Sequence, residues 1–140
     1  MANVTTIRRN LATQIGRISG LTAYPAWPGQ YHVPAAVVVP IRAEHEQTFG
    51  SSETYDLTRY DFEIVVLVPL AAGNEDAQRQ LDEFSSNVGS RSVRRAIVTD
   101  RTLGGVVSNV FFDGWGSYEE EPLNETIYLT QRLALQVWAT

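Results

Sequence analysis

Two segments in which apolar and polar residues alternate constrain the fold of this chain most. Residues 57–68 read LTRYDFEIVVLV, and residues 125–138 read ETIYLTQRLALQVW. Successive side chains of a strand point to opposite faces, so this alternation is typical of strands with one face against a core. The apolar residues that share one face are Tyr60, Phe62, Ile64, Val66 and Val68 in the first segment, and Ile127, Leu129, Leu133, Leu135 and Val137 in the second. Both segments are therefore predicted to be strands of a sheet.

Two further strands are expected. Residues 35–39, AAVVV, form a short β-branched run that is typical of a strand buried on both faces. Residues 106–118 read as a strand that precedes residues 125–138, with EEEPLN as the turn between the two. Residues 41–56 are polar and without period, which predicts a long loop between the first two strands.

Helices are predicted in the remaining segments. Apolar residues recur at steps of three and four over residues 5–18 and again from Asn74 to Val88, and Ser92 can begin a short third helix. Gly104 and Gly105 are interpreted as the stop of that third helix. The order of elements predicts an α+β fold: a mostly antiparallel four-stranded sheet with two or three helices packed on one face.

Length and composition narrow the classes of function. The 140 residues suit a single domain, 1–140, and no apolar run is long enough to cross a membrane, so no membrane association is expected. The chain contains no cysteine and no lysine, which excludes thiol nucleophiles, cysteine metal sites, Schiff-base amines and a P-loop lysine. The net charge of −5 opposes tight binding to a nucleic acid backbone.

No set of residues with a catalytic pattern emerges. Glu44, His45 and Glu46 are adjacent, but on a strand or a helix their side chains diverge, and His32 stands alone in a loop. Gly114 to Gly116 lack the third glycine of a dinucleotide site, and no GxSxG occurs. The chain is expected to be no enzyme and to hold no cofactor or metal. A small ligand-binding or hydrolytic enzyme that uses residues 41–56 as a lid stays as a distant alternative.

Charged residues gather in two clusters. The basic one comprises Arg91, Arg94, Arg95 and Arg101, and the first three are spaced to share one side of a short helix. The acidic one is the triplet Glu119, Glu120 and Glu121. Both clusters could be solvated faces, but arginine without lysine favours fixed, bidentate pairing with carboxylates.

A segment rich in proline and aromatic residues, LTAYPAWPGQYHVP at 21–34, is predicted to be an ordered, irregular crossover. Tyr24, Trp27 and Tyr31 are candidates for a docking surface, because aromatic side chains are enriched at interfaces. The alternative is that these residues cap an open end of the core.

Several segments together resemble the tail terminator proteins of long-tailed bacteriophages, particularly those that infect actinobacteria. The similarity covers nearly the whole chain and includes YPAWPG, AAVVVP, YDFEIVVLVPL, DAQRQLDEF and LALQVWA. Its most specific part is SVRRAI followed by DRTLGG. The hairpin FDGWGSYEEEPLNETIYL is more acidic than is usual in that family.

The resemblance implies a structural virion protein of the tail, made in the host cytoplasm and located at the end of the tail next to the head. It implies a ring, expected to contain six copies, that terminates the tail tube and joins it to head-completion or stopper proteins, while DNA passes through the lumen without tight binding. In such a ring the arginine and glutamate clusters suit a heterologous contact between neighbours. Another neck component, such as a head-tail joining or stopper protein, and a monomeric adaptor are alternatives.

Overall fold

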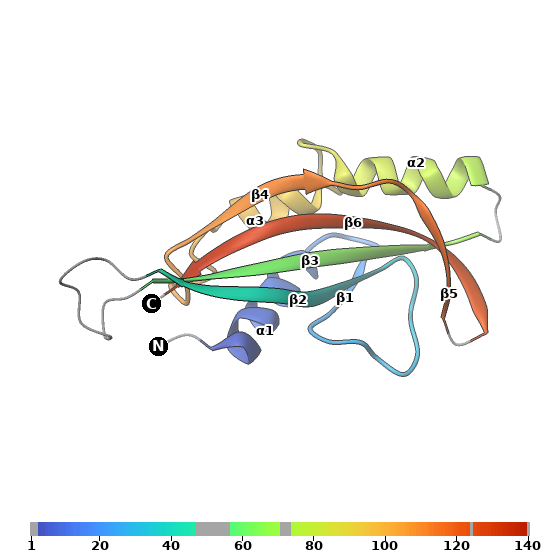
Figure 1. The fold of residues 1–140 in the computed structure, drawn as a ribbon. Coiled ribbons are helices and arrows are strands. Elements are labelled where there is room, and N and C mark those ends of the chain that lie inside the picture. The colour runs from blue at the N-terminus through green and yellow to red at the C-terminus, as the bar shows by residue number, and fades with distance from the viewer. Residues whose placement is uncertain (1–2, 47–56, 71–73, 124, 140) are drawn as a thin grey trace.

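A computed structural model describes residues 3–46, 57–70, 74–123 and 125–139. Within these residues the structure has three helices and six strands, arranged as Figure 1 shows. In chain order they are α1 (Val4–Ile15), β1 (Thr22–Tyr24), β2 (Ala35–Glu46), β3 (Leu57–Pro69), α2 (Asn74–Ser85), α3 (Val93–Val98), β4 (Asn109–Trp115), β5 (Glu119–Leu123) and β6 (Thr126–Ala139).

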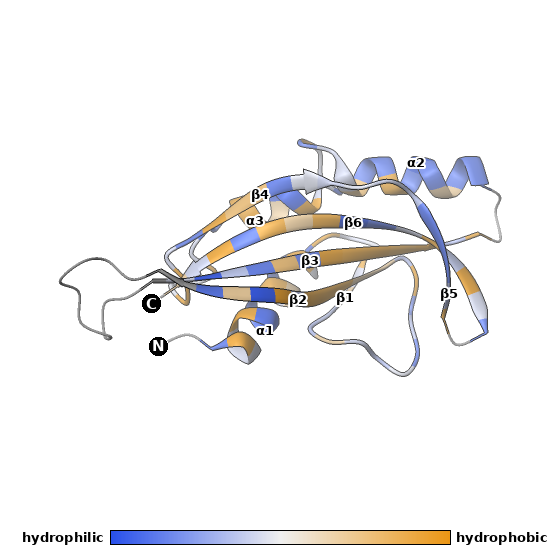
Figure 2. Ribbon diagram, viewed as in Figure 1, coloured by the Kyte–Doolittle hydropathy of each residue, from blue (hydrophilic) through white to orange (hydrophobic). Residues whose placement is uncertain are grey.

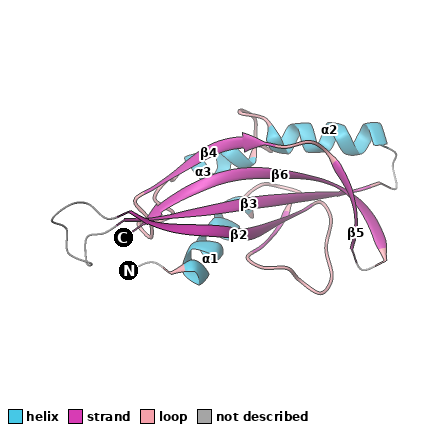
Figure 3. Ribbon diagram, in the orientation of Figure 1, coloured by secondary structure: helices cyan, strands magenta, loops and turns pink. Residues whose placement is uncertain are grey.

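The strands form one mixed sheet in the order β1-β2-β3-β6-β4, with β5 also paired to β6 (Figure 3). β1 runs parallel to β2, and every other pair is antiparallel. The α+β class agrees with the prediction, but the predicted four-stranded sheet is wrong, because the sheet has six strands among the described residues and is mixed, although most of its pairs are antiparallel. The sequence analysis missed two short strands, β1 and β5, for different reasons.

β1 escaped prediction because it lies inside the crossover that is rich in proline and aromatic residues. Thr22, Ala23 and Tyr24 pair in register with Ala35, Ala36 and Val37. A strand of three residues shows no measurable alternation, so only the parallel partner reveals it.

β5 escaped prediction because its sequence, EEEPL, carries charges and a proline that are typical of a turn. It pairs with residues 126–130 of β6, on the side of β6 that β4 also occupies. An edge strand tolerates charged side chains and a proline, because its outer side needs no hydrogen-bonded partner. β4 and β5 thus follow one another along the same edge, and the predicted turn at EEEPLN is wrong.

The predicted loop at 41–56 is also corrected. β2 continues through residues 41–46 in register with β3, with an irregularity between Pro40 and Arg42. Arg42 and Glu44 carry opposite charges and pair with charged residues of β3, so the segment is polar without being a loop. Residues 47–56, the rest of the predicted loop, lie outside the described residues.

All three helices contribute to one core cluster on one face of the sheet, as predicted. Ile7, Leu11 and Ile15 of α1 join Leu81 and Phe84 of α2 and Ile97 of α3. The sheet contributes alternate residues of its central strands, including Phe62, Ile64, Val66, Leu133, Leu135 and Val137. The alternation in the sequence therefore located most of the buried face correctly. Two predicted core residues are exposed instead: Ile127 at the start of β6 is 54% exposed, and Val88, predicted to be part of the α2 stripe, is 73% exposed.

The helix ends show which caps the chain uses. The side chain of Asn3 accepts the backbone N–H of Thr6 at 2.9 Å and begins α1. Ser92 caps α3 as predicted, by accepting the N–H of Arg95 at 3.1 Å. α3 ends at Val98, so the two glycines do not stop it. They belong to the turns that follow, where Gly104 and Gly105 have φ values of 74° and 90°.

The helix-free face of the sheet is divided into two parts. Near β1 it is apolar, with Ala35, Val37, Val65, Leu67 and Tyr128 in a second buried cluster. Toward the other end it carries charges, and Figure 2 shows β2 changing from hydrophobic to hydrophilic along its length. Here Arg59 lies 2.6 Å from Glu44 and 3.4 Å from Asp61, and Arg42 lies 3.5 Å from Asp61.

Candidate interaction surfaces

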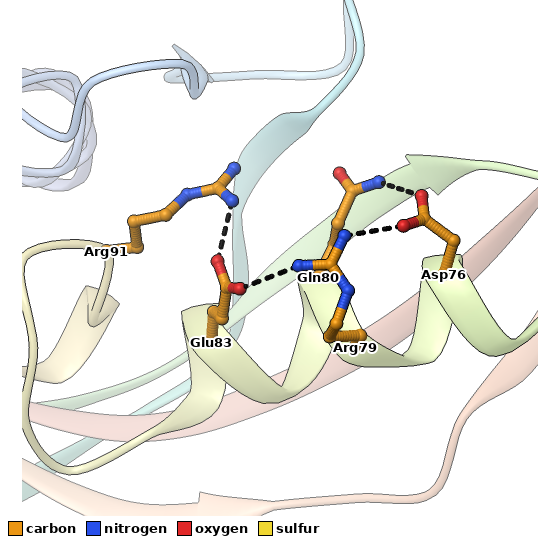
Figure 4. A network of polar contacts seen from close by, with 5 residues as sticks. All are labelled: Asp76, Arg79, Gln80, Glu83 and Arg91. Carbon is orange, nitrogen blue, oxygen red and sulfur yellow. Dashed lines mark hydrogen bonds and ion pairs between the residues drawn. The ribbon is translucent and has the colours of Figure 1, made fainter. Parts of the chain in front are cut away.

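The four arginines of the basic cluster do not form one patch. Arg91 precedes the cap of α3 and turns toward α2, where its Nη1 lies 2.7 Å from Oε2 of Glu83 and its guanidinium lies 4.4 Å from the centre of the Phe84 ring. Figure 4 shows that Glu83 also forms an ion pair with Arg79, and that Arg79 forms a second ion pair with Asp76. Arg91 is therefore already paired within the chain.

Two further carboxylates of α2 also accept hydrogen bonds from side chains of the same chain. The hydrogen bond from Arg79, supported by Gln80, holds the pKa of Asp76 below its usual value. Asp82 accepts the hydroxyl of Tyr118, and that bond raises the pKa of Tyr118. The α2 surface thus has its charges largely satisfied internally.

Arg94, Arg95 and Arg101 have no ion pair among the described residues. Arg94 lines a surface hollow with Phe112, Asp113 and Trp115. Arg95 lines a different hollow, between the end of α1 and α3. Arg101 is exposed and donates one long hydrogen bond, 3.5 Å, to the carbonyl of Val110. The expectation that Arg91, Arg94 and Arg95 share one side of a helix does not match these positions.

The helical layer contains further arginines that the sequence analysis did not select. Arg8 and Arg9 lie on α1, and Arg17 lies in the turn after it. Within the described part of the chain none of the three forms an ion pair. Helices α1 and α3 are in contact. The guanidinium groups that form no ion pair among the described residues therefore come from these two helices and from the turns that follow them.

The three glutamates of the acidic triplet also differ in their surroundings. Glu121 is half-buried, and its Oε1 lies 2.9 Å from Nη2 of Arg132 and 3.2 Å from the hydroxyl of Thr130. Burial lowers the pKa of Arg132, but hydrogen bonds to Glu121 and Glu63 outweigh this effect and raise it. Glu119 and Glu120 are exposed, and no described side chain pairs with either carboxylate. Only these two glutamates of the triplet are free to bind another molecule.

The aromatic crossover packs over the apolar part of the helix-free face. The Tyr31 ring meets three others edge to face: those of Tyr24 and Trp27, each at 6.3 Å, and that of Tyr128 at 5.9 Å. Burial, followed by the nearby Tyr128 and Glu121, raises the pKa of Tyr31. Tyr24 and Tyr31 therefore cap the second cluster, whereas Trp27, 45% exposed, keeps a surface that a partner could contact.

Exposed aromatic residues also lie along β4, at the edge of the sheet. Phe111 is 46% and Trp115 is 62% exposed. Trp115 stands between two hollows, one shared with Arg94 and one shared with Glu63 and Arg132. This edge was not predicted because the segment reads as an ordinary strand. Only the sheet order shows that none of the described strands pairs with the outer side of β4.

Membrane-spanning helices, metal-binding clusters and similar proteins were also sought. No helix in the described residues is long and apolar enough to cross a membrane, and no group of three or more potential metal ligands occurs among them. No protein-family model matches the chain, and no curated protein matches it.

Proposed function

We propose that this chain is the tail terminator protein of a long-tailed bacteriophage, a structural component that forms a ring of six copies on the end of the tail tube next to the head. The resemblance over nearly the whole chain, with SVRRAI and DRTLGG as its most specific part, supports this proposal. The role proposed is assembly rather than catalysis.

One observation carries the proposal. The free arginines lie on the α1–α3 layer, and the free glutamates of the triplet lie on β5, so a single chain offers two complementary surfaces that it does not use itself. A contact between two different surfaces of identical chains is heterologous. It closes into a ring when a whole number of such rotations completes one full turn. Ion pairs at such a contact fix the relative orientation of the subunits.

The net charge of −5 supports a lumen through which DNA passes, because an acidic protein does not hold the phosphate backbone tightly. Trp27 and Trp115 are available on the outer surface for the tail tube protein or for head-completion and stopper proteins.

The test is tube capping. Purified chain is added to polymerising tail tube protein of the same virus, and tube lengths are measured by electron microscopy. A terminator binds tube ends and stops their growth. Binding to head-completion proteins without any effect on tubes indicates another neck component, and binding to neither contradicts the proposal.

A further inference from the structure

A basic hollow lies between the turn after α1 and helix α3. It has a volume of about 280 Å³ and is lined by Arg17 from the turn, by Arg95 from α3, and by polar side chains that include Gln14, Ser90 and Thr99. Among the described residues, no acidic side chain lines it. Two cationic groups, one from each side, thus face a space large enough for an anionic side chain.

The carboxylate of Asp100, the residue after Thr99, lies near enough to Arg17 for that charge to help lower its pKa, but its hydrogen bonds are made to its own turn. It accepts the backbone N–H of Thr102 at 3.1 Å, the hydroxyl of Thr102 at 2.7 Å and the N–H of Gly104 at 2.8 Å. Within the described residues it forms no ion pair with Arg17 or Arg95. The guanidinium groups at the hollow are therefore free to bind a carboxylate from elsewhere, and arginine binds carboxylates with two parallel hydrogen bonds.

Glu119 and Glu120 have the complementary properties. Both are exposed on β5, which pairs with β6 on one side only among the described strands. Their register partners Thr130 and Leu129 lie on opposite faces of the sheet, so the two carboxylates project to the two sides of the strand. Each face of the β5 edge therefore presents one free carboxylate.

We propose that the hollow flanked by Arg17 and Arg95 receives Glu119 and Glu120 from a second copy of this chain, and that this contact, repeated head to tail, closes the ring. The inference rests on the proposed function and names the surfaces that meet. The proposed contact uses Arg17, which lies outside the basic cluster of the sequence. Arg91 and Glu121 take no part in it, because each is paired within its own chain.

The distribution of charge along the chain supports the choice of a second copy as the occupant. Residues 1–43 contain four arginines and no acidic residue, whereas the other 97 contain seven arginines and all 16 acidic residues. The charges of the two parts are thus +4 and −9, which sum to the net −5. Each copy carries surfaces of both signs, so a contact between two copies can bring opposite charges together.

The experiment uses two full-length variants with reversed charges, Arg17→Glu/Arg95→Glu and Glu119→Arg/Glu120→Arg, studied by native mass spectrometry at moderate salt. Each variant alone should lose the ring and stay a folded monomer by circular dichroism. Mixed in equal amounts they should form a ring of alternating variants, because each reversed surface then meets its reversed complement. Arg9→Glu is the matched control: it changes an exposed arginine of α1 outside the hollow and should keep the ring.

Several results would overturn the inference. One is a ring formed by either variant alone, and another is failure of the two folded variants to associate on mixing. If Arg17→Glu/Arg95→Glu does not fold, the second variant, altered only on an exposed edge strand, tests the same contact, and a ring from it alone rejects the contact. Loss of duplex DNA binding in Arg17→Glu/Arg95→Glu with the ring intact assigns the hollow to nucleic acid instead. A monomeric wild-type chain rejects the proposed ring itself.

Discussion

The Nη2 atom of Arg132 lies 2.9 Å from Oε1 of Glu121, which joins the edge strand β5 to the centre of the sheet. Nη1 of the same arginine lies 3.2 Å from Oε2 of Glu63 on β3, so one side chain links three strands. This arrangement separates Glu121 from its two neighbours in the sequence. Glu121 serves the fold, and Glu119 and Glu120 stay available for contacts outside the chain.

The first prediction compares two adjacent glutamates. Glu121→Gln should lower the free energy of unfolding by up to about 1 kcal/mol, because it weakens a partly exposed ion pair, while Glu120→Gln should change it by about zero. Urea unfolding of both variants measures the difference. Equal losses in the two variants would show that Arg132 does not hold Glu121 in solution.

The second prediction concerns the pH dependence of stability at Asp100. Hydrogen bonds from Thr102, then from the backbone of Gly104, hold the pKa of Asp100 below its usual value. A carboxyl whose pKa is lowered by folding stabilises the protein above its unfolded pKa, about 3.9, and loses that contribution as the pH falls through the lower folded value. Asp100→Asn should therefore destabilise the protein at pH 7, and the gap between wild type and variant should shrink toward pH 3.

Urea unfolding of the two proteins at a series of pH values measures that gap. A gap that stays constant down to pH 3 would contradict the role of the ionised carboxylate, because the lost hydrogen bonds would then not depend on charge.

The third prediction concerns the turn after α3. Gly105 has a φ of 90°, which an L-residue rarely adopts, and open space surrounds the position of an added Cβ. Gly105→Ala should therefore destabilise the protein by about 1 kcal/mol through backbone strain alone. Gly116→Ala is the control, because Gly116 also has open space and does not have a left-handed φ. Thermal unfolding should separate the two, and similar melting temperatures would place Gly105 in an ordinary conformation.

The fourth prediction ranks two aromatic residues of the crossover. Tyr31 is half-buried and meets three rings, whereas Trp27 is exposed and meets only Tyr31 among the described rings. Tyr31→Ala should cost roughly 2–4 kcal/mol of unfolding free energy and Trp27→Ala roughly 1 kcal/mol. Denaturant unfolding gives the order, and a larger loss for Trp27 would mean that the crossover is anchored differently.

The long alternating strands and the amphipathic helices were predictable from the sequence because each buries a continuous stripe. Phe62, Ile64 and Val66 repeat every second residue, and Ile7, Leu11 and Ile15 repeat every fourth, so the period alone defines the buried face. Such patterns need no knowledge of the partner element, and the structure confirms them.

The sheet edges and the pairing of charges were not predictable in the same way. Residues 119–123 contain three glutamates and a proline, and only their register with β6 identifies them as a strand. Glu121 and Glu120 are chemically identical, yet Arg132 reaches only one of them. Arg17 lay outside the recognised cluster because it is far from Arg95 in the sequence, and α1 and α3 bring the two together only in the folded chain.

The mass of the purified wild-type chain under native conditions tests the central claim most directly. The chain of 15.6 kDa should give one dominant closed species of six copies that dissociates as the salt concentration rises, since ion pairs between neighbours hold it together. A single monomeric species at low salt and at micromolar concentration would contradict both the ring and the assembly role derived from it.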